Sequence, residues 1–118
     1  MIDAEHARHF AAEWIDAWNA HDLERILAHY ADDFEMASPV IAQVAGEPSG
    51  VLRGKANVAA YWKKALAMMP DLHFTLERVL AGAESVAIAY RGHRGASVET
   101  FWFGTDGKVV RAAPHYEV

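Results

Sequence analysis

In the first half of the chain, apolar residues recur every three or four positions, which is the spacing of one helix face. This stripe predicts a first helix over residues 3–20. A shorter stripe over residues 23–30 follows Asp22, whose carboxylate suits an N-cap, and predicts a second helix. A third helix is predicted over residues 54–69, because Pro70 cannot continue it.

The segment between the second and third predicted helices lacks this period. Residues 34–38 predict a short strand. Residues 39–53 contain two prolines and two glycines and predict a long loop. Loops of this length often form lids or pocket walls, so this one is a candidate wall of a binding site.

In the second half the apolar period changes from 3.6 to 2, which is the period of β-strands. Glycine-containing connections at residues 81–84 and 105–107 suit tight hairpins, so the strands predict an antiparallel meander. Helices followed by strands favour an α+β fold over a doubly wound parallel sheet. The predicted strands cover residues 72–81, 85–93, 97–104 and 109–116.

The predicted strand 97–104 is apolar on both faces. Phe101 and Phe103 alternate to one side, and Val98 and Trp102 to the other. Three helices can cover only one face of the sheet, and a large exposed apolar surface usually marks an interface. We therefore expect a homodimer formed through the uncovered sheet face. The alternative is a face that is merely rich in aromatic residues.

Composition narrows the class of protein. A length of 118 residues fits one domain, residues 1–118. No apolar run approaches the roughly 20 residues of a membrane span, and the start of the chain carries no secretory signal. We therefore expect a cytoplasmic protein that does not bind membranes. The net charge of −5, without a basic cluster, argues against nucleic acid as a partner.

The residue types also limit the chemistry. The chain has no cysteine, which excludes disulfides, thiolate nucleophiles and Cys-ligated metals. His6 and His9 share a helix face, but no carboxylate motif beside them matches a zinc or iron site. No nucleotide-binding or serine-hydrolase motif occurs. We expect neither a metal nor a cofactor.

Five segments together resemble the NTF2-like superfamily, and within it the SnoaL-like and ketosteroid-isomerase-like proteins. The resemblance implies a cone-shaped, cystatin-like α+β fold, in which three N-terminal helices pack on a curved antiparallel sheet around a pocket for a small hydrophobic molecule. It covers nearly the whole chain. The segments are residues 14–20, 30–33, 38–40, 54–62 and 101–109.

The resemblance also implies which positions carry chemistry. Ketosteroid isomerases use an aspartate before a Pro-Val pair to move a proton, and here that position is Ser38, whose hydroxyl is too weak a base. The tyrosine that donates a hydrogen bond from the first helix is replaced by Trp14. The carboxylic acid two residues before an aromatic-x-aromatic segment is kept as Glu99.

Glu99 is the most informative candidate. On an inward strand face beside phenylalanines, a carboxyl loses hydration, its pKa rises, and its protonated form can donate to a carbonyl. The alternative is a structural ion pair with Arg91 or His93 on the neighbouring strand. His115, near the end of the last strand, is the second catalytic candidate. The candidate ligand-binding residues are Trp14, Trp18, Tyr30, Ser38, Tyr61, Trp62 and Phe101.

Three functions stay open at this point. The first is a cofactor-independent enzyme, of isomerase, cyclase or hydrolase type, acting on a steroid- or polyketide-like carbonyl compound. The second is a non-catalytic protein that binds such a molecule, for which the aromatic walls suffice. The third is a protein-association module.

Overall fold

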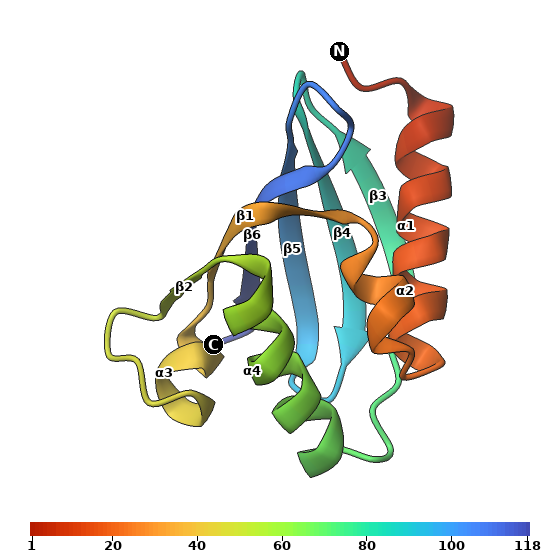
Figure 1. The fold of residues 1–118 in the computed structure, drawn as a ribbon. Coiled ribbons are helices and arrows are strands. Elements are labelled where there is room, and N and C mark those ends of the chain that lie inside the picture. Colours follow the sequence, from red (N-terminus) through yellow and green to blue (C-terminus); the bar gives the residue numbers. More distant parts are fainter.

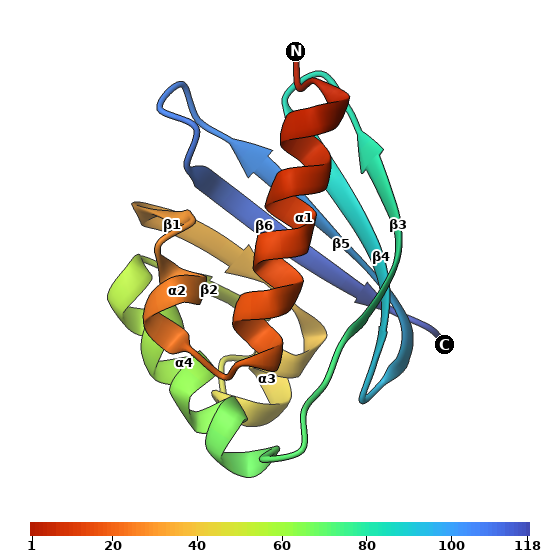
Figure 2. The same ribbon diagram turned by 90° about the vertical axis from the view of Figure 1, so that its right-hand side faces the viewer.

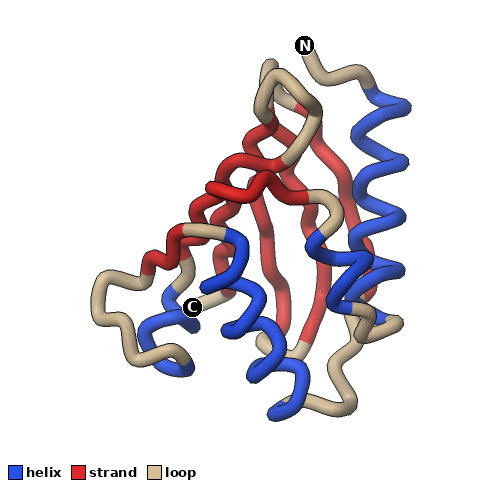
Figure 3. Tube along the Cα trace, viewed as in Figure 1, coloured by secondary structure: helices blue, strands red, loops and turns tan.

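Six strands form one mixed sheet, and α1, α2 and α4 pack on the same side of it (Figures 1 and 3). The computed structural model describes residues 1–118. Its helices are α1 (Ala4–Asn19), α2 (Leu23–Leu27), α3 (Pro39–Val44) and α4 (Lys55–Met68). Its strands are β1 (Tyr30–Ala37), β2 (Val51–Arg53), β3 (Thr75–Ala81), β4 (Ser85–Gly92), β5 (Gly95–Phe103) and β6 (Val109–Tyr116).

The strands are ordered β2-β1-β6-β5-β4-β3 across the sheet. Strands β3 to β6 form the predicted antiparallel meander. Strand β1 joins β6 in parallel, however, so the sheet is mixed rather than wholly antiparallel. This pairing is long-range and parallel, so no hairpin turn connects the two strands and no turn motif in the sequence predicts it.

Helix α1 runs across the inner face of the sheet (Figure 2). Asp3 caps its N-terminus by accepting a hydrogen bond from the His6 amide, and Asp22 caps α2 in the same way with the Arg25 amide. The predicted apolar stripe is the face that α1 buries, including Phe10, Trp14 and Trp18. None of the helices combines the length and apolar character needed to cross a bilayer.

The prediction of a continuous loop over residues 39–53 is wrong. Ser38 caps α3 by accepting a hydrogen bond from the Val40 amide, and Pro39 occupies the first helical turn, where a missing N–H is harmless. Strand β2 then pairs antiparallel with β1. Such short elements have no periodicity of their own, and their partners in the sheet and in α4 stabilise them.

Two other predicted boundaries move. Helix α2 ends at Leu27, and Tyr30 already belongs to β1, where it pairs with Val109. The strand predicted from residue 72 begins at Thr75. The segment that leads into β3 is held by Asn19, whose side chain forms hydrogen bonds of 2.7 and 2.9 Å with the backbone N–H and carbonyl of Phe74. These contacts join the end of α1 to the entry of β3.

The outer face of the sheet is exposed. Val98 and Trp102 of β5 point to this side, and Val98 keeps 40% of its surface accessible. Arg111, opposite Trp102 on β6, lies 4.8 Å from the centre of the indole ring. Leu80 of β3 is 53% exposed. This face therefore has the apolar character that led us to expect a homodimer.

Candidate functional site

Helices α1 and α4 and the inner face of the sheet enclose a cavity of about 140 Å³. It opens where Met68, His93 and Arg94 are exposed. An apolar cavity of about this volume holds a benzene-sized molecule. Its apolar and aromatic lining consists of Trp14, Trp18, Met36, Val40, Val44, Tyr61, Trp62, Ala65, Met68, Met69, Leu72, Phe74, Tyr90 and Tyr116, and the other lining residues are Gly92, His93, Arg94, Ser97 and Glu99.

Glu99 is the buried acidic group of this cavity. Alternation along β5 turns it inward with Phe101, and its side chain is only 3% exposed. Burial raises its pKa from the ordinary 4.5 to about 8, and hydrogen bonding from Tyr90 opposes part of that rise. Its Oε2 atom has no hydrogen-bond partner in the protein. At neutral pH the group is therefore a protonated acid that can donate a hydrogen bond.

Four tyrosines surround this carboxyl. Burial raises the pKa of Tyr30, Tyr61, Tyr90 and Tyr116, and the negative charge of Glu99 adds to the rise in each case. The pKa of Tyr61 reaches about 12. All four hydroxyls therefore stay protonated at neutral pH, and the three in the cavity lining, those of Tyr61, Tyr90 and Tyr116, are possible hydrogen-bond donors to a ligand.

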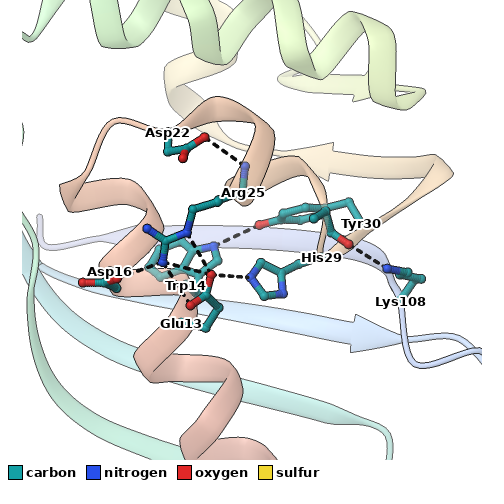
Figure 4. Close-up of polar contacts among 9 residues, drawn as sticks. Glu13, Trp14, Asp16, Asp22, Arg25, His29, Tyr30 and Lys108 are labelled. Carbon is teal, nitrogen blue, oxygen red and sulfur yellow. Dashed lines mark hydrogen bonds and ion pairs between the residues drawn. The ribbon is translucent and has the colours of Figure 1, made fainter.

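Trp14 and Tyr30 form a buried hydrogen bond with each other. The Trp14 indole Nε1 donates a hydrogen bond of 3.0 Å to the Tyr30 hydroxyl oxygen, and both side chains are buried (Figure 4). The Trp14 N–H is thus occupied and is not available to a ligand. Trp18, one turn further along α1, lines the same cavity, and its buried Nε1 has no partner. Of these two indoles on α1, only that of Trp18 is free to donate.

The structure divides the predicted ligand-binding residues into two groups. Trp14, Trp18, Tyr61 and Trp62 line the cavity, together with the catalytic candidate Glu99. The other three lie deeper: Tyr30 and Phe101 are core residues, and Ser38 is the buried cap of α3.

His115 lies outside the cavity. It pairs with Val98 on the outer side of the sheet, is exposed, and its Nδ1 lies 3.1 Å from the Ala113 carbonyl oxygen. The next residue, Tyr116, lines the cavity instead. A strand alternates sides at every residue, so the prediction chose the wrong one of two neighbours.

The structural partners considered for Glu99 do not contact it. Arg91 points to the outer face, where its Nε lies 3.7 Å from a Glu77 carboxylate oxygen. His93 is exposed at the mouth of the cavity. The carboxyl is therefore buried without an ion pair.

Sequence reasoning missed Tyr90, Ser97 and Tyr116, which lie side by side on three adjacent strands. Ser97 has the same parity as Glu99 on β5, so the alternation already contained that signal. The two tyrosines required the register between strands, which the sequence pattern of one strand does not contain.

A second polar cluster ties α1 to α2 and to the start of β1 (Figure 4). Arg25 Nη2 lies 3.0 Å from Glu13 and 2.8 Å from Asp16, and His29 lies 4.0 Å from Glu13. Lys108 donates a hydrogen bond of 2.7 Å to the Ala28 carbonyl oxygen. Arg25, Glu13, Asp16 and Lys108 have partners and hold the elements together, whereas the buried His29 Nε2 has no hydrogen-bond partner. No group of three or more His, Asp or Glu side chains has a metal-binding arrangement.

Comparison with known proteins identifies the family. Residues 11–113 match the model of the SnoaL-like domain, and the chain belongs to that family. A SnoaL-like protein of unknown function from Burkholderia thailandensis E264 is 59% identical, with a TM-score of 0.95 over 99% of this chain and 98% of that one. Among curated proteins, none matches the sequence.

More distant structures share the fold alone. A candidate ketosteroid isomerase from Kribbella flavida DSM 17836 is 23% identical, with a TM-score of 0.74 over 97% of this chain and 79% of that one. TerC, co-crystallised with polyporic acid, is 15% identical, with a TM-score of 0.76 over 94% and 91%. The predicted NTF2-like, cystatin-like fold and the SnoaL-like membership are thus confirmed.

Proposed function

We propose that the protein binds a small hydrophobic molecule carrying a carbonyl or similar oxygen, and that protonated Glu99 donates a hydrogen bond to that oxygen. The cavity volume suits a single ring, and larger ligands would have to extend through the mouth. The aromatic walls supply apolar contact, as in most small-molecule sites.

The observation that carries this proposal is a buried, unpartnered polar atom on each of two cavity-lining residues, one from β5 and one from α1. Glu99 Oε2 and Trp18 Nε1 are both buried, and neither has a partner in the protein. A buried polar group left unsatisfied costs about 1–3 kcal/mol, and proteins seldom keep one without a use. A ligand oxygen that accepts from these groups would satisfy them.

The titration range of Glu99 favours a second candidate, proton-transfer catalysis without a cofactor. A group with a pKa of about 8 can both give and take a proton near neutral pH. Ser38 cannot replace it, because its buried Oγ caps α3 and a hydroxyl is a far weaker base. An isomerase- or cyclase-type reaction in this cavity would therefore depend on Glu99, the one buried acid/base group in the lining.

Carboxyl-carbon NMR titration tests the proposal, with Glu99→Gln to assign the signal. We expect a pKa near 8 that rises further when cyclohexanone is added, because an oxygen acceptor binds only the protonated acid. Cyclohexanone affinity should fall in the wild type as pH rises through 8 and stay constant in Glu99→Gln, whose amide donates at every pH. A pKa near 4.5 that ligand does not move would contradict the proposal.

Hydrogen–deuterium exchange at the carbon next to the bound carbonyl separates the two candidates. Exchange that is accelerated by the wild type and lost in Glu99→Gln would support catalysis. Binding without accelerated exchange would favour a non-catalytic binding protein.

A further inference from the structure

We propose that the ligand carries an acidic group that pairs with Arg94 at the cavity mouth, so that the site selects a single-ring oxo-acid over a neutral ketone. This inference rests on the proposed function, because it assumes that the ligand oxygen lies at Glu99. It describes the other end of the ligand, which faces the cavity mouth, and so narrows the class of ligand to acids.

Arg94 is free to receive an anion. It lies in the turn between β4 and β5, lines the cavity and is exposed. None of the ion pairs in the chain includes it. Its guanidinium lies 5.7 Å from the centre of the Tyr116 ring, and its Nη2 makes one long hydrogen bond of 3.4 Å to Gln43. Most guanidinium donors thus remain available for a carboxylate.

The charges along the cavity favour an anion at this point. Glu99 is the only acidic residue in the lining, and it is uncharged at neutral pH. Arg94 is therefore the only group there that carries a permanent charge, although the whole chain has a net charge of −5. The uncharged Val44, Met68 and Met69 also line the cavity. The nearby carboxylate of Glu117 approaches Gly95, the residue after Arg94, but forms no ion pair with Arg94.

The two polar ends fix the shape of the ligand. The buried Glu99 lies at the inner end, the exposed Arg94 lies at the open end, and the aromatic lining leaves space for about one ring. A molecule with an oxygen acceptor on one side of a ring and a carboxylate on the other satisfies both ends. An Arg–carboxylate pair can also be bidentate, which would orient the ring.

The test compares 4-oxocyclohexanecarboxylate with its neutral methyl ester by tryptophan fluorescence at pH 7 and low salt. We expect the wild type to bind the acid about fivefold more tightly, which is the upper range for a solvent-exposed pair. Because the pair is exposed, high salt should reduce this preference. Arg94→Gln should abolish the preference, because acid and ester then bind with similar affinity.

Arg91→Gln is the matched control, because it removes the same charge from the same hairpin but from the outer face, where Arg91 contacts Glu77. It should keep the preference for the acid. The inference is overturned if the ester binds as well as the acid, or if Arg94→Gln still prefers the acid. If neither compound binds, the proposed function itself fails along with the inference, which is a distinguishable result.

Discussion

The two faces of β5 depart from ordinary burial in opposite ways. The inner face buries polar groups, Ser97 and Glu99, whereas the outer face exposes Val98 and leaves Trp102 only partly covered. A buried unpaired carboxyl and an exposed apolar surface both weaken an isolated chain. We therefore relate the inner face to a ligand and propose the outer face as the contact with a second copy of the chain.

The largest expected effect is a pH dependence of the free energy of unfolding that comes from Glu99 on the inner face. Unfolded Glu99 releases its proton near pH 4.5, while the folded protein holds it until about pH 8. Between these values the folded state binds more protons, so the free energy of unfolding falls as pH rises. We expect a loss of as much as about 5 kcal/mol between pH 4.5 and pH 9, measured by urea denaturation.

Glu99→Gln isolates this effect because it keeps the shape and removes the charge. Its free energy of unfolding should lack this decline, and above pH 8 it should be more stable than the wild type. A wild type whose stability is constant or increases over the same range would show that Glu99 is ionised inside the fold.

The outer face is tested by Val98→Asp. If two copies meet there, the substitution places two carboxylates in an apolar interface and should weaken the dimer more than a hundredfold, or about 3 kcal/mol. Sedimentation measures the change. Leu76→Asp is the matched control, because Leu76 is 37% exposed against 40% for Val98 but pairs with Tyr90, on the inner side. A monomeric wild type would refute the proposed interface.

The same two faces show how far the sequence could be interpreted. The alternation within β5 placed Glu99 beside Phe101 on the inner side, because side-chain parity is a local property. His115 was assigned to the wrong side because parity alone does not say which neighbour faces inward. The row of Tyr90, Ser97 and Tyr116 depends on the register of three strands, so it appears only in the folded chain.

In the helical part, too, local patterns could be predicted from the sequence and long-range contacts could not. The stripes of α1 and α4 are long enough to define their buried faces from the sequence. The elements α3 and β2 are too short for any stripe, and long-range pairing with β1 decides the structure of residues 51–53. Unpaired donors such as Trp18 Nε1 could not be predicted either, since an indole is free only when its neighbours are known.

The smallest expected effect concerns the hydrogen bond between Trp14 and Tyr30 on the inner side. Tyr30→Phe removes the acceptor of the Trp14 N–H and leaves it buried without a partner, which should cost about 2 kcal/mol of unfolding free energy. A double-mutant cycle with Trp14→Phe should give a coupling of about 1 kcal/mol by urea denaturation. No coupling would mean that Trp14 finds another acceptor. The contrast between an occupied Trp14 and a free Trp18, which assigns Trp18 to the ligand, would then disappear.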